Sequence, residues 1–235
     1  MPSTPRRRPT TRNGRPVLTE EIIATKALEM AGIQGFSAVT MRSLAAELGV
    51  TVRALYNYVD DRQRVIDLAI SQMLAGWQPP QLDSADWQTS VADYAAALRQ
   101  LYRRWPRALL IILDEEATPA TVHPNRLVNV ESFLQLLRGA GLSLSAALEA
   151  HRHLALALFS FALLVDYPAD HRAPARPSAA GIAASWLDQY PDLDLTATRE
   201  AALLPSPTPD DQFDTLVGDL IDLIELRMPA SGRTR

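Results

Sequence analysis

The chain has 235 residues, of which 47% are hydrophobic and 6% aromatic, and its formal net charge is −4 at pH 7. It has no cysteine, which excludes disulfides, thiolate metal sites and cysteine nucleophiles. Alanine and leucine dominate the apolar residues, so helices are expected rather than sheets. No apolar run approaches the roughly 18 residues of a membrane span, and the arginine-bearing start lacks the apolar segment of a secretory signal. We therefore expect a cytoplasmic protein with no membrane partner.

Charge is distributed unevenly along the chain, with a balance of +3 over residues 1–70 and −7 over residues 71–235. Residues 1–17 are rich in Pro, Thr and Arg and lack apolar periodicity, so we expect a disordered basic arm. Its arginines are Arg6, Arg7, Arg8, Arg12 and Arg15. Such an arm suits contact with a polyanion, although a solubilising tail would have the same composition.

Four short helices are predicted over residues 18–76, from their capping residues and the helical spacing of their apolar residues. They run from Thr19 to Gly32 or Gly35, from Thr40 to Gly49, from Thr51 to about Tyr58, and from Asp60 or Asp61 to Gly76. This segment is expected to form a separate N-terminal domain.

Residues 77–228 are predicted to form a larger helical domain, followed by a disordered tail over residues 229–235. Its expected helices run from Trp87 to about Arg104, Ala108 to Leu113, 125–139, Ser143 or Ser145 to about Val165, Ser178 to Leu187, and Asp211 to Met228. The stretch from Leu154 to Val165 is apolar nearly all round, which indicates burial on more than one side. Residues 167–211 contain seven prolines and are otherwise expected to be loop.

The second and third predicted helices have the spacing of a helix-turn-helix. Such a motif needs a small residue where its helices nearly touch, a residue that tolerates the left-handed turn, and apolar residues that lock the pair. Ala45 and Gly49 meet the first two needs, and the locking positions are occupied by Leu44, Leu48, Val50 and Leu55. An ordinary helical hairpin with a glycine cap would have the same spacing.

The chemistry of the third helix favours DNA binding over that alternative. The segment from Thr51 to Tyr58 contains no acid. Arginine pairs with guanine, asparagine with adenine and apolar groups with the thymine methyl, whereas Tyr and Thr hydroxyls suit phosphates. With the arm and the flanking helices, the candidate DNA-binding residues are Arg15, Thr40, Arg42, Thr51, Val52, Arg53, Tyr56, Asn57, Tyr58 and Arg62.

The stretch from Gly14 through "VTMRSLAAELGVTVRALYNYVDDRQRVIDLAI" resembles the DNA-binding domain of the tetracycline repressor (TetR) family. The stretches "DWQTSVADYAAALRQL" and "FLQLLRGAGLSLSAALEAHRHLALALFSFALL" are similar to helices of the tetracycline-repressor-like C-terminal domain. The resemblance covers most of residues 14–166 and the last helix. It implies an all-α fold: an N-terminal three-helix DNA-binding domain with a helix-turn-helix, plus a larger helical domain for ligand binding and dimerisation.

The same resemblance implies a homodimer, formed through the helices around 143–166 and 211–228, that binds a palindromic operator in double-stranded DNA. It also implies an effector site in the body, at Gln78, Tyr94, Leu98, Tyr102, Leu113, Phe133, Leu137 and His151. These mostly apolar residues have a few polar groups, as ligand pockets do, although core packing would also account for each. Tetracycline repressors carry a magnesium-binding histidine where this chain reads Leu110 to Asp114, so a more apolar effector is expected.

No metal or cofactor site is expected. His151 and His153 are two residues apart and face different sides of a helix, so they cannot form the metal pair that i, i+4 spacing allows. The sequence has no nucleophile elbow, P-loop or dinucleotide fingerprint, which argues against an enzyme. The sequence therefore predicts a repressor that a small molecule releases from DNA; the alternative is a DNA-binding regulator without an effector, controlled by a protein partner or by its abundance.

Overall fold

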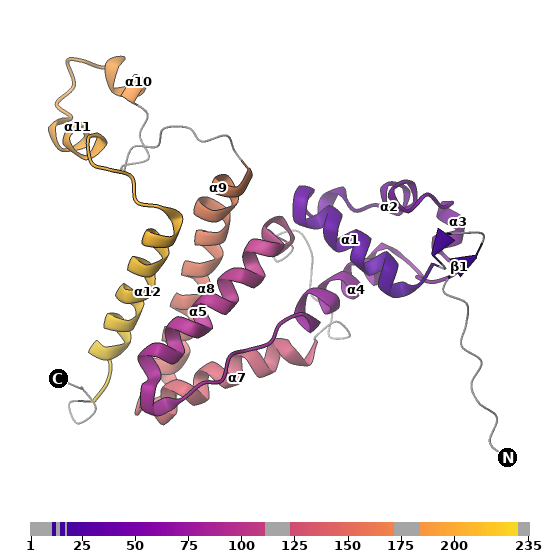
Figure 1. Ribbon diagram of the computed structural model, residues 1–235, viewed down its shortest axis with the longest axis horizontal. Coiled ribbons are helices and arrows are strands. Elements are labelled where there is room, and N and C mark those ends of the chain that lie inside the picture. The colour runs from indigo at the N-terminus through magenta and orange to yellow at the C-terminus, as the bar shows by residue number, and fades with distance from the viewer. Residues whose placement is uncertain (1–10, 13–14, 17, 111–122, 172–183, 230–235) are drawn as a thin grey trace. The chain divides into compact units, whose positions relative to one another are not determined.

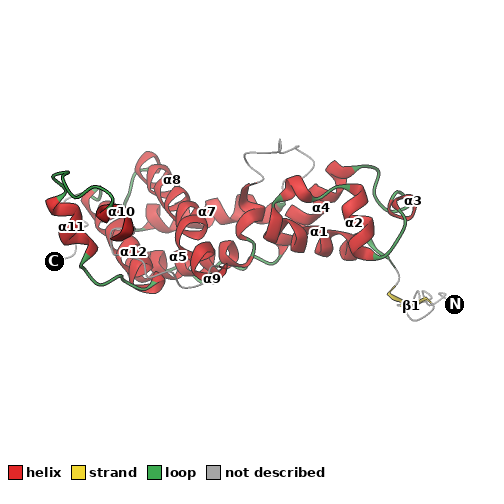
Figure 2. Cartoon of the chain, turned by 90° about the horizontal axis from the view of Figure 1, so that it is seen from above, coloured by secondary structure: helices red, strands yellow, loops and turns green. Residues whose placement is uncertain are grey.

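The computed structural model describes residues 11–12, 15–16, 18–110, 123–171 and 184–229 (Figure 1). The chain divides into two compact units, one formed by Met1–Gln78 with Arg107–Arg126 and the other by Pro79–Pro106 with Leu127–Arg235. The described residues are mainly helical, which confirms the all-α prediction (Figure 2). Within the arm they include two short antiparallel strands, β1 (Thr11–Arg12) and β2 (Arg15–Pro16), a pairing that the sequence did not predict.

The first unit is built on the packing of its first and fourth helices. Its helices are α1 (Glu20–Gln34), α2 (Met41–Leu48), α3 (Val52–Leu55) and α4 (Arg62–Ala75), with 3₁₀ turns η1 (Phe36–Ala38) and η3 (Pro106–Leu110). Ile23 and Ala27 of α1 are fully buried, as are Ile66 and Ala69 of α4. Burying each isoleucine stabilises the unit by roughly 1.5–3 kcal/mol. Helix α2 packs on α1, and α3 packs on α2.

The second unit is a bundle in which α5, α8 and α12 pack on one another. Its elements are η2 (Ser84–Asp86), α5 (Trp87–Arg104), α7 (Pro124–Gly139), α8 (Leu144–Phe161), the π-helical turn η5 (Ala162–Asp166), α9 (Tyr167–His171), α10 (Ala184–Asp188), α11 (Thr196–Ala202) and α12 (Pro209–Leu226). The first three residues of α7 belong to the first unit, because the division falls after Arg126.

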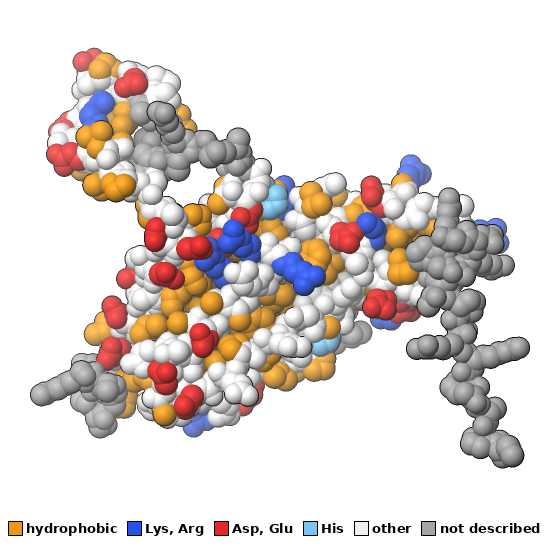
Figure 3. All heavy atoms as spheres, in the orientation of Figure 1, with side chains coloured by type: hydrophobic (Ala, Val, Ile, Leu, Met, Phe, Trp, Pro, Cys, Tyr) orange, Lys and Arg blue, Asp and Glu red, His pale blue; other side chains and the backbone are white. Residues whose placement is uncertain are grey.

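A buried ion pair joins three elements of this bundle. Arg99 of α5 donates through Nε and Nη2 to both carboxylate oxygens of Asp166, at 2.9 and 2.6 Å. Asp166 is fully buried at the end of η5, and Asp210 of α12 lies 2.9 Å from Nη1 of the same arginine. The guanidinium also lies over Phe213, 4.4 Å from the ring centroid. The bidentate geometry fixes α5 against η5, and the contact with the exposed Asp210 links α5 to α12. Basic and acidic side chains are both present on the face of this unit that Figure 3 shows.

Several helix boundaries differ from those predicted. Gly32 is buried inside α1, which ends at Gly35 with φ of 83°. The third helix ends at Leu55 rather than near Tyr58, and the last begins at Pro209, capped by Thr208, rather than at Asp211. Two helices, α9 and α11, lie in stretches that were expected to be loop, whereas α10 ends at Asp188, one residue beyond the helix predicted to end at Leu187. The predicted boundaries at Leu113 and Ser178 lie outside the described residues.

One continuous helical stretch, Leu144–His171, is long and apolar enough to cross a membrane, whereas the sequence had suggested no such segment. Of its most apolar window, 28% is buried within the chain. Length and composition alone are weak evidence for a membrane span, because the core or interface helix of a globular protein meets the same criteria.

Candidate functional site

The start of α2 is fixed by a reciprocal cap. Thr40 Oγ1 accepts from the backbone N–H of Ser43 at 3.0 Å, and Ser43 Oγ accepts from the backbone N–H of Thr40 at 2.9 Å. Two N–H groups that the first helical turn would leave unpaired are thereby satisfied. Thr40 was predicted as a phosphate contact, and the structure shows that it also sets where α2 begins. The sequence analysis did not predict the role of Ser43, although a polar residue three positions after a threonine is typical of a reciprocal helix cap.

The turn between α2 and α3 depends on Gly49, which has φ of 65° and ψ of 33°. Only glycine adopts this left-handed conformation without steric cost. It allows the N–H of Val50 to donate back to the carbonyl oxygen of Ala45 at 3.0 Å. Leu44, Ala45 and Leu55 are buried at the junction of the two helices, as the spacing predicted. The two helices therefore have the local construction of a helix-turn-helix.

The second helix of this pair presents polar side chains to solvent. Thr51 caps α3 by accepting from the N–H of Ala54 at 3.2 Å. After α3 ends at Leu55, the N–H groups of Tyr58 and Val59 still donate to the Leu55 carbonyl oxygen, so the chain continues to turn. The exposed residues here are Thr51, Arg53, Tyr56, Asn57 and Tyr58, with Val52 half-buried. Arg42 is exposed on α2.

Arg62, predicted to contact DNA, makes hydrogen bonds within the first unit. Its Nε donates to the carbonyl oxygen of Val39 at 2.7 Å, and its Nη2 donates to that of Phe36 at 2.8 Å. Phe36 begins η1 and its carbonyl oxygen also accepts the N–H of Val39 at 3.0 Å, whereas Val39 follows η1, directly before the cap of α2. The guanidinium therefore anchors the entry to the helix-turn-helix from α4, a structural role that the sequence did not predict, and its contact with DNA stays a prediction. Arg15 lies in β2, and its side chain is outside the described part of the structure.

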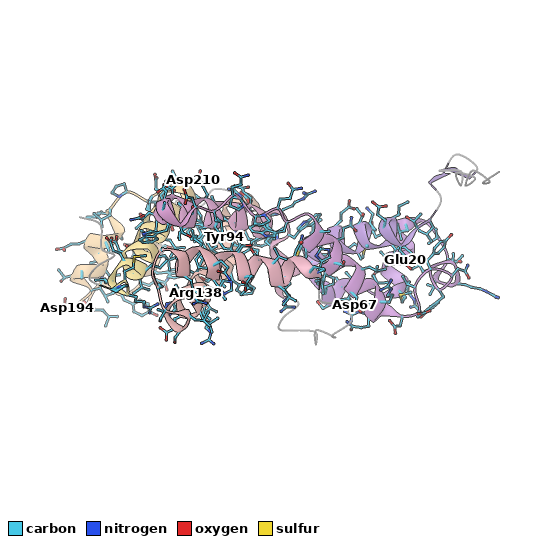
Figure 4. All side chains as sticks on the ribbon, turned by 90° about the horizontal axis from the view of Figure 1, so that it is seen from below. Glu20, Asp67, Tyr94, Arg138, Asp194 and Asp210 are labelled. Carbon is cyan, nitrogen blue, oxygen red and sulfur yellow. The ribbon has the colours of Figure 1, made fainter. Side chains whose placement is uncertain are left out.

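Five of the eight predicted effector residues lie in the interior of the second unit. The rings of Tyr94 and Phe133 have centroids 4.7 Å apart, and those of Phe133 and His151 are 5.8 Å apart. Leu98 and Leu137 are buried in the same bundle. We call Tyr94, Leu98, Phe133, Leu137 and His151 the aromatic cluster; Figure 4 labels Tyr94 among the helices of this unit.

The aromatic cluster has a polar edge that the sequence did not reveal. The hydroxyl of Tyr94 donates to Oδ1 of Asn129 at 2.7 Å and lies 3.2 Å from the Asn129 carbonyl oxygen. Burial raises the pKa of the Tyr94 hydroxyl, and burial lowers the pKa of His151 below its ordinary value. Both groups are therefore uncharged near pH 7, and the cluster is apolar with two neutral hydrogen-bonding groups.

The other three predicted effector residues differ in their placement, and of these Tyr102 lies near enough to Tyr94 to contribute to the raised pKa of its hydroxyl, after the larger effect of burial. Gln78 is exposed at the end of the first unit, and Tyr102 is half-buried in the last turn of α5. Leu113 lies outside the described residues. Within the part of the chain that is described, no group of three or more His, Asp or Glu side chains is placed to hold a metal ion.

Together, the fold and these sites define a chain with a capped helix-turn-helix in one unit and a helical bundle with an aromatic cluster in the other. Residues 79–216 match the family model for the "Tetracyclin repressor-like, C-terminal domain", and residues 23–63 match that for "Bacterial regulatory proteins, tetR family". The chain belongs to the tetR family, which confirms the resemblance seen in the sequence.

Two curated relatives are regulators of the same type. The chain is 30% identical over 138 residues to the "HTH-type transcriptional repressor DrrR1" of Streptomyces coeruleorubidus. The aligned residues make up 58% of this chain and 49% of that protein. It is 26% identical over 136 residues to an "HTH-type transcriptional regulator" of Saccharopolyspora erythraea, or 58% of this chain and 56% of that protein. The matches therefore span about half the length of these relatives.

Solved structures show the same fold. ActR of Streptomyces coelicolor in complex with actinorhodin has a TM-score of 0.66 at 24% identity, covering 91% of this chain and 98% of that one. TetR of Acinetobacter baumannii AYE has a TM-score of 0.59 at 23% identity, covering 91% and 100%. Another similar structure is a variant of the latter in complex with minocycline, with a TM-score of 0.60 at 20% identity, covering 91% and 97%.

Proposed function

We propose that this protein is a dimeric DNA-binding repressor that a small-molecule effector releases from a palindromic operator. The observation that carries the proposal is the exposed, acid-free face of α3, held by two capped helices and a glycine turn in a chain of the tetR family. Relatives named as a repressor and a regulator, and related folds with bound ligands, support it.

Each exposed side chain of the motif has a role in DNA binding under this proposal. Arg53 would pair with guanine and Asn57 with adenine, while Val52 would contact a thymine methyl group. The remaining candidates, Arg15, Thr40, Arg42, Thr51, Tyr56 and Tyr58, would bind phosphates and fix the position of α3 in the major groove. Base preference should therefore depend on Arg53 and Asn57, and overall affinity on the others.

Dimerisation through α8 and α12 is supported by apolar side chains that one copy leaves in solvent. Leu156 and Leu164, along α8 and η5, are 68% and 74% exposed, and Leu226 of α12 is 69% exposed. A second copy related by two-fold symmetry would cover these side chains. The two helix-turn-helix motifs would then bind half-sites about 34–36 Å apart, which is one turn of DNA.

The chemistry of the aromatic cluster supports an uncharged, largely apolar effector. Tyr94 is held protonated and His151 neutral, so neither supplies a charge that would compensate an ionised ligand in the interior. The rings of Tyr94 and Phe133 would stack on a planar aromatic ligand, and Asn129 would exchange its bond with Tyr94 for one with the ligand.

The full burial of Tyr94, Phe133 and Leu137 also fits a packed core. That observation favours the second candidate function, a DNA-binding regulator without an effector, controlled by a protein partner or by its abundance. Both candidates describe a non-enzymatic cytoplasmic protein, and they differ in whether a small molecule binds the folded chain.

The DNA-binding proposal is tested with duplexes that the full chain selects from a random-sequence library. Selected sites should be palindromic, with affinity that falls steeply as salt is raised. Arg53→Ala or Asn57→Ala should relax preference at one base pair by about 1–3 kcal/mol, whereas deleting residues 1–13 should weaken binding to all sequences. Arg138→Ala, which removes an exposed arginine of the second unit, is the control. Unchanged affinity in a combined Arg53→Ala, Tyr56→Ala variant would show that α3 does not bind DNA.

Effector binding and dimerisation have separate tests. Actinorhodin and minocycline are suitable first probes, and either one, if it binds the folded chain, should raise its melting temperature and release the selected duplex. A broad panel of neutral aromatic compounds that gives neither result would favour the effector-free candidate. Leu156→Asp should convert a dimer to a monomer in light scattering, whereas Leu203→Asp, at another exposed leucine, should not.

A further inference from the structure

Helices α8 and α12 lie side by side and antiparallel in the second unit (Figure 1). The rings of Phe161, at the end of α8, and Phe213, near the start of α12, have centroids 5.6 Å apart. At the other end of the pair, Nη2 of Arg227, directly after α12, lies 3.7 Å from Oε2 of Glu149, near the start of α8. A residue that precedes Phe161 on α8 therefore lies at the same height along the pair as the residue that follows Phe213 by the same number of positions.

The two helices expose sides of different charge. The exposed side of α8 carries Arg152 and His153, and Glu149 is the only acid of that helix. Helix α12 contains neither lysine nor arginine, and its exposed acids are Asp211, Asp214, Asp219 and Asp222. Asp222 lies at the height of Arg152, and in the part of the chain that is described neither side chain has an ion-pair partner. One copy of the chain thus leaves a basic side of α8 next to an acidic side of α12.

Gly218, in the middle of α12, is exposed, and a Cβ added there would meet no atom within 4 Å. Its backbone is helical, so no turn or positive φ requires a glycine at this position. Glycine within a helix costs stability relative to alanine, and packing within one copy gives no reason for it. Leu156 of α8, at the same height, is 68% exposed. The exposed face therefore combines an open site on α12 with a protruding leucine on α8.

We propose that a second copy of the chain binds this face with its α12 on α8 and its α8 on α12. Leu156 of each copy then packs over Gly218 of the other, and Arg152 of each copy pairs with Asp222 of the other. This arrangement has a two-fold axis parallel to the helices, a rotation that exchanges the two sides of the pair and keeps the height of each residue. The proposal rests on the proposed function and adds to it which helices meet across the dimer and what selects the partner.

The other two-fold arrangement would place α12 of one copy on α12 of the second. The exposed aspartates would then face one another with no cation on either helix, and like charges at short range oppose association. Placing α12 on α8 of the second copy brings the acidic side to Arg152 and His153 instead. The same charges disfavour a partner whose last helix is basic, so the face selects a second copy of this chain.

Charge reversals exchanged between chains test this pairing. Arg152→Asp places an acid against Asp222 twice in each dimer, and Asp222→Arg brings two arginines together. Each variant alone should therefore dimerise at least about tenfold more weakly than the wild-type chain in sedimentation. An equimolar mixture should restore dimerisation to within about threefold, because the heterodimer has two complementary pairs. Native mass spectrometry with one variant isotopically labelled identifies the heterodimer.

Arg138→Asp and Asp93→Arg are the matched controls, at exposed positions of α7 and α5, and should leave dimerisation unchanged. Single reversals that leave dimerisation unchanged would overturn the pairing of α8 with α12, and so would a mixture that stays as weak as the single variants. A wild-type chain that is monomeric at every concentration would instead refute the proposed dimer itself. The two failures are therefore distinguished by the wild-type chain alone.

Gly218→Leu tests the apolar contact at the centre of the face. The added side chain has space within one copy, and leucine is a better helix former, so in a Leu156→Asp background the melting temperature should stay unchanged or rise. In the otherwise wild-type chain, Gly218→Leu should weaken dimerisation at least about tenfold, because it occupies the place of Leu156 of the second copy. Ala96→Leu, at an exposed alanine of α5, is the control. Unchanged dimerisation with Gly218→Leu would show that no helix approaches α12 at this point and would overturn the proposal.

Discussion

Gly49, at the turn between α2 and α3, allows a quantitative test of how the helix-turn-helix is stabilised. Its φ of 65° lies in the left-handed region, and a Cβ added there would meet no atom within 4 Å. The cost of Gly49→Ala is therefore conformational rather than steric. An alanine in the left-handed region costs about 1–2 kcal/mol relative to the right-handed one.

Gly76→Ala is the matched control. Gly76 has φ of −74° and ψ of −7°, and a Cβ there would lie 3.5 Å from the Met73 carbonyl oxygen, an ordinary contact. Both substitutions remove similar freedom from the unfolded chain, about 0.4–1 kcal/mol, and this contribution cancels when they are compared. We therefore expect the first unit to be less stable with Gly49→Ala than with Gly76→Ala by about 1–2 kcal/mol. This difference corresponds to about a 5–30-fold change in the equilibrium constant for opening of the α2–α3 junction.

Native-state hydrogen exchange of the full-length variants measures this difference at the turn itself. The Val50 N–H donates to the Ala45 carbonyl oxygen at 3.0 Å, so its exchange reports opening of the α2–α3 junction. Protection of Val50 should be about 5–30-fold lower in Gly49→Ala than in Gly76→Ala. Equal protection in the two variants would refute the argument that the left-handed backbone, and not space, requires glycine here.

Three further substitutions test the assigned roles. Arg62→Leu should destabilise the first unit by about 2–4 kcal/mol in chemical unfolding, since two charge-assisted bonds are lost, whereas Arg42→Leu, at an exposed arginine, should change it by less than about 0.5 kcal/mol. Asp166→Asn should cost about 3–5 kcal/mol because Arg99 stays buried with only the exposed Asp210 as a charge partner, and Asp170→Asn at most about 1 kcal/mol; similar losses would contradict the burial argument. His151 has a folded-state pKa below its unfolded value of about 6.5, so the unfolded chain protonates first and stability should fall as pH drops through about 6.5. His151→Gln should flatten this part of the profile of melting temperature against pH, and an unchanged profile would exclude His151 as its cause.

Local signals account for the parts of the site that were predicted correctly. Thr40, Gly49 and Thr51 act on residues at most five positions away, through caps and a turn whose requirements are specific to residue type. The burial of Leu44 and Leu55 follows from spacing along two short helices. These interactions are encoded within about twenty residues, so the sequence predicts them without knowledge of the rest of the chain.

Long-range partners account for what was missed. Arg62 was expected to contact DNA because it flanks the motif in sequence, and its anchoring bonds to Phe36 and Val39, 26 and 23 residues away, were not predicted. Asn129 is unremarkable in the sequence, and its partner Tyr94 is 35 residues distant. An arginine or asparagine side chain can serve a carbonyl, a carboxylate or a base edge equally well, so residue type alone does not assign it.

The amino-acid sequence by itself determined the helical class, the helix-turn-helix with its caps and glycine turn, and the family, because these depend on short-range spacing and backbone conformation. Only the tertiary structure decided that Arg62 anchors the motif, that Asp166 is buried against Arg99, and that Asn129 binds the Tyr94 hydroxyl. The physical reason is that the role of a polar side chain depends on the partner with which it forms hydrogen bonds. Folding brings that partner from a distant part of the sequence.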